Sequence, residues 1–572
     1  MSLPSSHGGS NPTTSNLPTT PKQLHGHERS ILNPLSDEEA LKIAGKKQVL
    51  KREWNFWACL GLAATTLTTW EGIGLTVSST FLNGGPVGII YGFIICLIGV
   101  LAIMLSLAEM ASISPIAGAQ YHWTAEHAPP RFQAFFSYVQ GWLTVLAWQA
   151  ALTSIAYLTS VAIQTLIIFN HASYDPKAWH LTVLMIGLSV IACVFVIFAR
   201  AIVPHTEMVG GSLHVYVSRP VRIARATDTV RLFFFLVVIG ILATSHKAPS
   251  ADVWTKFIHQ GWPHVPGISF CIGFLSPALS LAGADGVVHL SEETFNANRN
   301  IPRAMWMAVA INGAMALVYI IVILYAITDL DAVLNSPAGA IAELYFQATR
   351  NKNAANAMLA AIPIIAGFNM IGMYTSLSRL IWAFARDNGL PFSRFISHIS
   401  PWNSTPNRAV LLAFLCTCIL GCINLGNTTA FNSLLSLSTI AIYFSYGFPI
   451  ALFFTRRFSK NPPVLGPWNL GRWGPAVNVV AILFGTFLTI FLPFPPISPI
   501  TAQNFNWSGP MLAGVMILAI IDYFVEARHR FTGPLREIKD DTTSDSGGVV
   551  EQEKVVDKRS SNANLMDTGD GL

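Results

Sequence analysis

Long runs without a charged residue alternate with short polar segments along most of the chain. Asp, Glu, Lys and Arg are absent from Gly72 to Ala108, from Phe132 to Tyr174 and from Ala409 to Thr455. A helix needs about 20 apolar residues to cross a bilayer, so the longest runs must fold back at the turn residues within them. The pattern predicts twelve membrane spans, near residues 54–82, 86–108, 132–168, 179–199, 201–244 (interrupted), 266–290, 304–327, 357–384, 408–424, 428–453, 474–492 and 508–525.

The composition supports the same class of protein. Of the 572 residues, 52% are hydrophobic and 11% are charged, whereas soluble domains carry roughly 25% charged residues. The net charge of +5 is scattered, without the basic stripe that nucleic acid requires, so we expect the lipid bilayer and no nucleic acid as a partner. The seven cysteines lie in apolar runs without the paired spacing of a zinc site, and we expect neither a metal nor another cofactor.

Both ends of the chain differ from its middle. Residues 1–50 and 528–572 are polar and poor in apolar side chains, which is typical of disordered tails. We therefore predict a membrane domain over residues 51–527. If the N-terminus lies inside, most Lys and Arg residues of the short loops also fall inside, so we expect both termini in the cytoplasm. The outer loops then hold only Lys177, Lys247, Lys256, Arg350 and Lys352.

Two apolar runs are interrupted by glycine and an acidic residue, at Thr68–Gly74 and at Leu281–Gly286. In hydrocarbon an unpaired backbone group costs several kcal/mol, so a helix breaks only where its backbone lines a protein cavity. Interruptions at corresponding places in two halves of a chain are typical of the midplane site of a transporter. We therefore predict substrate-binding residues at both breaks, namely Trp70, Glu71, Gly72, Ile73, Gly74, Ala282, Gly283, Ala284 and Asp285.

Several motifs are similar to one known family. The segment AEMASISPIAGAQYHW at 108–123 resembles the signature of the amino acid–polyamine–organocation permeases. The motifs LSEET at 290–294, IPRAM at 301–305 and PFPP at 493–496 resemble the fungal amino acid/choline branch of that superfamily. The motif TWEG at 69–72 is more similar to its GABA-permease-like members than to its choline members.

This resemblance, which covers about Phe56 to Tyr523, implies both a fold and a function. The fold is all-α and LeuT-like, with two inverted five-helix repeats, two extra helices, and discontinuous helices 1 and 6. The function is secondary active uptake of an amino acid or related amine such as GABA, with protons as the expected coupling ion. The alternatives are a choline or quaternary amine permease and a transporter-like nutrient sensor. The plasma membrane is the expected location, with the vacuolar membrane as the alternative.

The predicted site residues each have a second interpretation. Glu71 can hold a substrate ammonium group or carry the coupled proton, but it can also be a helix-end carboxylate satisfied by backbone amides. The amides of Gly72, Ile73 and Gly74 can bind a substrate carboxylate, but small residues also permit a close helix crossing. Asp285 can bind substrate or cap the helix that resumes after the break.

Further acidic residues are candidates for gating or coupling besides Glu71. Glu109 follows the second span, while Glu292 and Glu293 lie in another inner loop. Their charges pair when a gate closes, or they are simply solvated loop charges. Glu207 lies near the inner end of the interrupted fifth span, where it serves proton coupling or is an interfacial carboxylate. Aromatic residues that can wall the pocket are Trp142, Trp148, Phe270, Phe274 and Tyr374.

Two other classes of membrane protein fit the sequence less well. A channel favours rings of like residues from symmetric subunits, whereas this chain has two breaks in two halves. A membrane enzyme carries clustered His and Asp residues or a nucleophile motif within its spans, and the sequence contains none. We therefore predict a transporter and no enzymatic activity.

Residues 215–231 do not fit any membrane span. They contain Arg219, Arg222, Arg225 and Arg231, and each arginine at span depth costs roughly 2.5–3.5 kcal/mol. We predict that these 17 residues translate an unspliced intron of 51 nucleotides, because their removal leaves a continuous fifth span of 27 residues from Ala201 to Thr244. The alternative is an arginine-rich arm that divides the span into stubs of about 14 residues, too short to cross a bilayer.

Overall fold

The computed structural model describes residues 45–535 together with Asp37 and Leu41, except for positions 68, 172, 215–238, 242, 244–246, 427 and 503. Within these residues the secondary structure is helical, apart from one isolated bridge between Trp54 and Thr294. The predicted arginine-rich insert at 215–231 lies outside the described residues. The helix that directly precedes the insert is α8 (Val203–His214), which begins the predicted fifth span.

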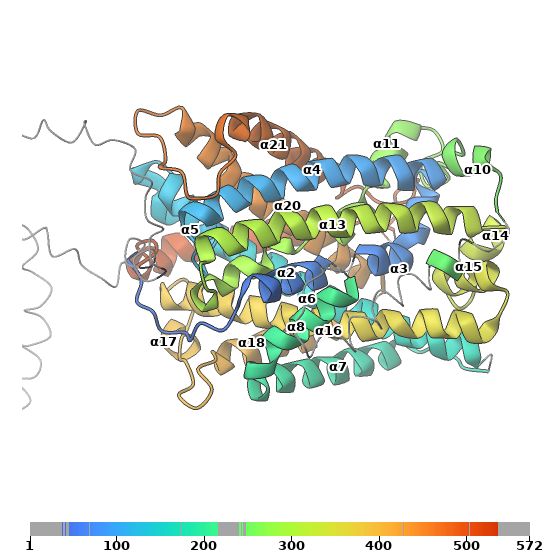
Figure 1. Cartoon of the computed structure of the whole chain (residues 1–572), viewed down its shortest axis with the longest axis horizontal. Coiled ribbons are helices and arrows are strands. Elements are labelled where there is room, and N and C mark those ends of the chain that lie inside the picture. The colour runs from blue at the N-terminus through green and yellow to red at the C-terminus, as the bar shows by residue number, and fades with distance from the viewer. Residues whose placement is uncertain are drawn as a thin grey trace, which may run out of the picture.

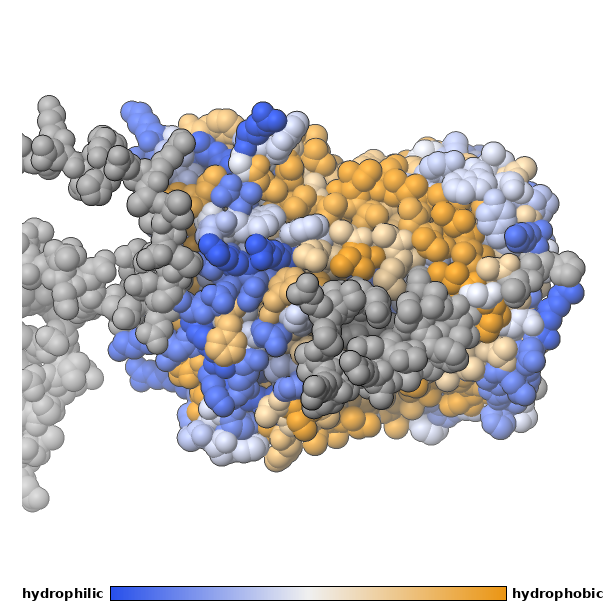
Figure 2. Space-filling view, in the orientation of Figure 1, coloured by the Kyte–Doolittle hydropathy of each residue, from blue (hydrophilic) through white to orange (hydrophobic). Residues whose placement is uncertain are grey.

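The long helices run along one axis and form a bundle (Figure 1). Figure 2 shows an apolar band around the middle of this bundle with hydrophilic surface at both ends. In the described part of the chain, ten helical segments are long and apolar enough to cross a membrane. The long helices are α4 (Gly85–Ile113), α6 (Gln133–Asn170), α7 (Ala178–Phe198), α13 (Ala297–Ala326), α16 (Lys352–Arg386), α18 (Asn407–Gly421), α20 (Thr428–Arg457), α21 (Gly474–Phe491) and α22 (Ser508–Asp522).

Short helices cover the two ends of the bundle (Figure 1). One end carries α5 (Gln120–His127) and α17 (Ser393–Ile396), and we call it the α5 end. The opposite end carries α10 (Ser250–Trp254), α14 (Leu330–Leu334) and α15 (Ala340–Thr349), and we call it the α15 end.

The sixth helix is interrupted, as predicted. It consists of α11 (Pro266–Ile272), α12 (Leu275–Ser280) and the 3-10 helix η3 (Ala284–Glu293). Between α12 and η3, Gly283 adopts φ +107°, a left-handed conformation that favours glycine. Residue 68, between α2 (Phe56–Leu67) and α3 (Thr69–Leu82), lies outside the described residues, so the break in the first helix stays a prediction. The predicted all-α membrane fold is confirmed.

The three residues that were predicted to bind through unwound backbone amides are helical. Gly72, Ile73 and Gly74 lie inside α3, so the chain is not unwound at any of them. The glycines allow close packing instead. A Cβ atom at Gly74 would lie 2.2 Å from Ile341 Cδ1, and one at Gly72 would lie 2.9 Å from Ser280 Oγ. The close helix crossing is thus the correct interpretation of Gly74, because its backbone is helical and its Cα faces α15.

The membrane domain extends beyond the predicted limits at both ends. Lys46 and Leu50, which we expected in the disordered N-terminal tail, are 1% and 2% exposed. Phe531, expected in the C-terminal tail, is 1% exposed. Residues 45–50 and 528–535 therefore pack on the bundle, since their few apolar and charged side chains find partners there. The remainder of both predicted tails, apart from Asp37 and Leu41, lies outside the described residues.

Candidate functional site

The end of α2 lies against the break in the sixth helix, in the middle of the bundle. Thr66 is in the last described turn of α2, and its hydroxyl group donates a hydrogen bond to the carbonyl oxygen of Gly283 at 3.0 Å. The side-chain amide of Asn369, from α16, donates to the carbonyl oxygen of Thr66 at 3.4 Å. The carbonyl group of Gly283 therefore obtains a partner inside the protein, as a break at membrane depth requires.

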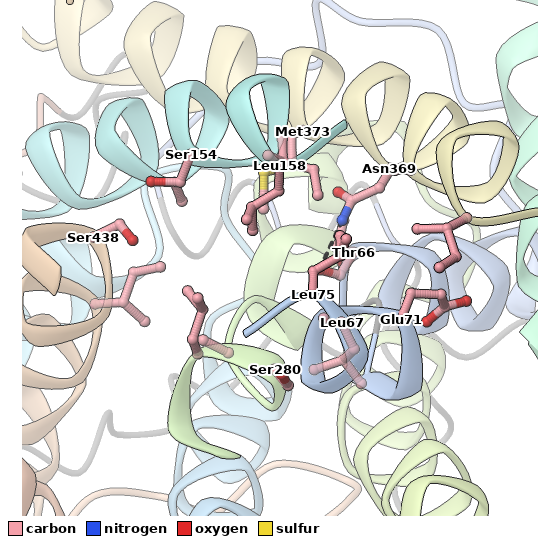
Figure 3. A pocket seen from close by; sticks show the side chains of 18 residues that line it. Thr66, Leu67, Glu71, Leu75, Ser154, Leu158, Ser280, Asn369, Met373 and Ser438 are labelled. Atoms are coloured by element: carbon pink, nitrogen blue, oxygen red, sulfur yellow. Dashed lines mark hydrogen bonds between the residues drawn. The ribbon is translucent and has the colours of Figure 1, made fainter. Parts of the chain in front are cut away.

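A cavity of about 50 Å³ lies beside this break and between it and residues of α2 and α3 (Figure 3). Its walls come from α2, α3, α6, α12, α16 and α20, so residues far apart in the sequence meet there. The lining residues are Thr66, Leu67, Glu71, Gly72, Leu75, Ala151, Ser154, Ile155, Leu158, Leu279, Ser280, Ala282, Ile362, Ala366, Asn369, Met373, Ser438 and Ile442.

The cavity is mostly apolar, and most of its hydroxyl groups present oxygen acceptors. Ser154 donates its proton to the carbonyl oxygen of Ala150 at 2.8 Å, and Ser438 donates to Leu435 at 2.7 Å. Their lone pairs remain available to a donor in the cavity. Among the lining residues Glu71 carries the one ionisable side chain. This arrangement suits a ligand with N–H groups, such as an ammonium group.

A donor for a carboxylate is also present. The Ser280 hydroxyl lines the cavity and has no hydrogen-bond partner among the described residues. The lining therefore offers a hydroxyl donor together with the acceptor oxygens.

Only part of the predicted binding set lines the cavity. Glu71, Gly72 and Ala282 do, whereas Trp70 packs on the ring of Tyr319 with 5.5 Å between centroids. The other predicted binding residues lie outside the lining, namely Ile73, Gly74, Gly283, Ala284 and Asp285. The five aromatic candidates also lie outside it, namely Trp142, Trp148, Phe270, Phe274 and Tyr374.

Sequence reasoning missed the contributions of α6 and α16. Ser154 and Leu158 are one turn apart on α6, and Asn369 and Met373 are one turn apart on α16. A polar residue one turn from an apolar one within a charge-free run was the available signal, since residues four apart share a helix face.

A second, larger cavity continues from the first toward the α15 end. Its volume is about 500 Å³, and it shares the side chains of Leu75, Leu158 and Leu279 with the central cavity. Beyond these leucines it is lined by Ser436 of α20 and, in the loop after α21, by Phe494, Pro496, Ile497 and residues 504–506. The central cavity therefore adjoins the larger one across three leucine side chains.

Buried ion pairs close the opposite side. Glu293 accepts a hydrogen bond from Arg379 Nε at 2.8 Å and lies 3.4 Å from Arg200 Nη2. Glu292 binds Arg386 through two hydrogen bonds of 2.8 and 2.9 Å. Both glutamate side chains are 1% exposed. The interpretation of Glu292 and Glu293 as solvated loop charges is therefore wrong, because η3 packs beneath α16 and removes both carboxylates from water.

Glu109 is paired at the same end of the bundle. Its carboxylate forms an ion pair with Arg457 and accepts a hydrogen bond from the backbone N–H of Leu470 at 3.3 Å. The Glu109 side chain is fully buried. This pair joins α4 to α20, and it is the third predicted gating residue that lies at the α5 end.

Asp285 lies between the cavity and the α5 end. Its Oδ2 accepts hydrogen bonds from Gln120 Nε2 at 2.6 Å and Trp148 Nε1 at 3.4 Å, while the hydroxyl group of Tyr446 donates to Oδ1. The capping interpretation of Asp285 is wrong, because its oxygens bind side chains of three other helices and η3 has Gly283 as its N-cap. Asp285 thus fastens η3 to α5, α6 and α20.

Glu207 is fully buried. Its backbone lies against α2, where a Cβ at Gly61 would be 2.4 Å from the Glu207 carbonyl oxygen. Its carboxyl group faces Gly372 of α16 and interacts with the hydroxyl group of Thr65. An interfacial, solvated carboxylate is therefore the wrong interpretation, because α8 packs tightly between α2 and α16.

Three comparisons place the chain among known proteins. The sequence model of a family described as amino acid permease matches residues 55–519. A choline transporter of Saccharomyces cerevisiae is 30% identical over 519 residues, covering 88% of each chain. The amino-acid permease BAT1 of Arabidopsis thaliana is 27% identical and covers 88% of this chain and 97% of the relative.

A fungal permease and a solved structure extend the comparison. Amino-acid permease 2 of Neurospora crassa is 28% identical and covers 87% of this chain and 89% of the relative. A manganese transporter of Eremococcus coleocola is 12% identical with a TM-score of 0.48, over 83% of this chain and 94% of that structure.

Proposed function

This chain belongs to the amino acid permease family, and we propose that it imports an amino acid or a related zwitterionic amine such as GABA, coupled to protons. The family consists of secondary transporters, and neither it nor the relatives are enzymes. The substrate, the coupling ion, the membrane and the orientation are the parts that we infer.

The observation that carries the proposal is the lining of the cavity beside the interrupted sixth helix, which combines Glu71 with several hydroxyl groups. Glu71 lies on one side of the cavity and Ser154 and Ser438 lie on the other (Figure 3), so each side offers acceptor oxygens to a primary ammonium group. The Ser280 hydroxyl suits the carboxylate. The surrounding aliphatic side chains fit the methylene groups between the two charges.

Choline is the second candidate, because the relative from Saccharomyces cerevisiae is a choline transporter. A quaternary ammonium group has no N–H donor and is characteristically bound by the faces of aromatic rings. None of the residues that line the central cavity is aromatic. The lining therefore favours the amino acid over choline.

In an alternating-access cycle the central cavity opens in turn toward the α15 end and toward the α5 end. The larger cavity opens toward the α15 end, while buried ion pairs close the α5 end, so this conformation admits substrate from the α15 side. The Lys and Arg bias places the α5 end and both termini in the cytoplasm. Movement of α2 and η3 away from α16 then opens a path for release. We expect this cycle at the plasma membrane, with the vacuolar membrane as the alternative.

Two buried carboxyl groups are suited to carry the coupled proton. Glu71 lies in the cavity and Glu207 beside the half-helix α2. Ionisable residues within membrane segments mark proton and substrate pathways. A proton bound at either residue moves with the helices that change position during the cycle.

Uptake of radiolabelled substrates in a transport-deficient yeast tests the proposal. The panel contains GABA, other amino acids and choline, each measured with and without a protonophore. We expect uptake of a zwitterion that falls when the proton gradient collapses. Uptake that survives the protonophore contradicts proton coupling, and uptake of choline alone contradicts the amino acid assignment. Binding without uptake of any substrate indicates a sensor.

A further inference from the structure

The chain turns back beneath the bundle after its last long helix. Arg530 donates one hydrogen bond to the carbonyl oxygen of Leu390 at 2.6 Å and another to Asp522 at 3.1 Å. Leu390 follows α16 and Asp522 ends α22, so Arg530 holds residues 528–535 across the α5 end. We call these eight residues the strap.

The strap is anchored by one aromatic side chain. Phe531 is 1% exposed, with its ring 5.4 Å from Tyr138 of α6 and 5.9 Å from Phe384 of α16. Phe384 in turn packs on Tyr121 of α5 at 5.2 Å. Such ring pairs contribute roughly 0.5–1.5 kcal/mol beyond the area that they bury. The strap is therefore part of the packed core and not a loosely attached end.

The strap also reaches the ion pairs of the α5 end. The backbone N–H of Leu535 donates to Asp387 Oδ1 at 3.2 Å, and the same oxygen atom binds the amino group of Lys46. The hydroxyl group of Tyr121 donates to Asp387 Oδ2 at 2.9 Å. Lys46 and Asp387 are both buried. One carboxylate at the end of α16 thus receives donors from the N-terminal segment, from α5 and from the strap.

Lys46 connects this carboxylate to the helix that must move. The segment from Lys46 leads into α2, the half-helix between the α5 end and the central cavity. A path from the cavity to the α5 end opens only if α2 or η3 leaves α16. The contact of Lys46 with Asp387 therefore opposes that movement, and the strap stabilises the position of Asp387.

We propose that the strap is a closing device of the α5 end, whose release from Phe384 and Asp387 is a step of substrate release. This inference rests on the proposed alternating-access function. Loss of the strap contacts shifts the protein toward the conformation that is open at the α5 end, so a change near the C-terminus alters transport without touching the cavity.

The test measures how readily the α5 end opens in the purified full-length protein. Ser291 lies on η3 between the cavity and the ion pairs, and it is 1% exposed. In a Ser291→Cys background, the rate of alkylation by a polar thiol reagent reports opening, with the protein lacking that cysteine as the baseline. Phe531→Ala and Arg530→Gln each remove one strap contact. Matched controls are Phe524→Ala, at an exposed phenylalanine, and Arg528→Gln, at an arginine that donates a hydrogen bond to the adjacent His529.

We expect both strap variants to raise the alkylation rate about threefold or more, in proportion to the population of the open state, while both controls leave it unchanged. Equal rates in all four variants overturn the proposal. If Phe531→Ala does not yield a monodisperse protein, Arg530→Gln decides alone. Alkylation needs no substrate, so the result is independent of the uptake experiment. A positive result in a chain that transports nothing refutes the proposed function and leaves the strap as a conformational lock.

Discussion

The hydroxyl group of Thr66 donates a hydrogen bond to the carbonyl oxygen of Gly283 across 3.0 Å, and so joins α2 directly to the break in the sixth helix. Thr66 belongs to α2 and Gly283 precedes η3, the two helices that lead from the cavity to the α5 end. We expect this hydrogen bond to make the two helices move together.

The first prediction concerns this hydrogen bond. Thr66→Val keeps the shape of the side chain but removes the hydroxyl donor to the buried carbonyl of Gly283. That carbonyl still accepts a hydrogen bond from the backbone N–H of Gly286 at 3.0 Å, so we expect a cost of about 0.5–1.5 kcal/mol. We expect a lower melting temperature and reduced uptake. Thr159→Val is the control, because the Thr159 hydroxyl donates only to Ile155 of its own helix at 2.7 Å. Equal effects of the two substitutions contradict a special role of the Thr66 hydroxyl.

The second prediction concerns Glu71. Glu71→Gln keeps the size and hydrogen-bonding capacity of the side chain but removes its charge and its exchangeable acid proton. We expect normal surface expression and strongly reduced uptake, because the ammonium partner or proton carrier is lost. Asp252→Asn, at the α15 end and outside the central cavity, serves as the control and should transport normally. Unchanged uptake kinetics in Glu71→Gln refute the assignment.

The third prediction concerns the bidentate pair of Arg386 with Glu292. Arg386 also stacks over the ring of Trp382, with its guanidinium carbon 4.3 Å from the centroid. A lysine keeps the charge but loses the two parallel hydrogen bonds and the planar stacking. We expect Arg386→Lys to destabilise the protein by about 1.5–3 kcal/mol, the range for hydrogen bonds to charged groups. Arg408→Lys, at an exposed stacking site on Phe395, should change the melting temperature little.

The fourth prediction concerns the pH dependence of stability through α5. Burial lowers the pKa of His127 from 6.5 to about 4, and its ring packs on Phe453 at 5.0 Å. The neutral form is favoured in the fold, so this stability is present above about pH 6.5 and is lost as the pH falls toward 4. The slope approaches about 1.4 kcal/mol per pH unit.

Melting temperatures between pH 7 and pH 4.5 check this expectation. His127→Phe keeps a ring against Phe453 and removes the titrating group. We expect the variant to lose less stability than the wild type over that range. Parallel curves for the two proteins show that other groups determine the acid sensitivity.

The fifth prediction concerns residues 215–231. We expect mature messenger RNA to lack the corresponding 51 nucleotides, and the shorter protein to reach the membrane and transport. Sequencing of the transcript measures this directly. Retention of those nucleotides in mature RNA, together with transport by the 572-residue chain, contradicts the intron hypothesis and supports an arginine-rich arm.

The sequence predicted the architecture well because hydrocarbon excludes charge so strongly. The charge-free runs mark the spans, and the glycine-rich interruption around Gly283 marks the sixth helix correctly. Gly72 and Gly74 were misleading for a physical reason, since small residues serve an unwound backbone and a close helix crossing equally well. The family resemblance does not distinguish an unwound backbone from a close helix crossing at these glycines.

The candidate site was less predictable than the fold. Ser154 and Asn369 lie in long helices where a polar residue is unremarkable unless the facing helix is known. Glu207 and Glu293 were difficult for the opposite reason, because position along the chain indicated the rim of the membrane. Tight packing of α8 and η3 against other helices buries both carboxylates instead. Pairing across the bundle is a tertiary property that one-dimensional spacing does not contain.

The two cavities share three apolar side chains, Leu75, Leu158 and Leu279, which we call the collar. The collar bears on whether inorganic ions leak through the protein and dissipate the ion gradient. A hydrated inorganic ion in the larger cavity would meet leucine side chains, which have no oxygen atoms to coordinate it. It would lose its water ligands there without replacement. Apolar constrictions of this kind block conduction by dewetting. An amine with a short hydrocarbon chain passes the same collar with its methylene groups in contact with the leucines. We therefore expect the collar to hinder the leak of inorganic ions through the two cavities.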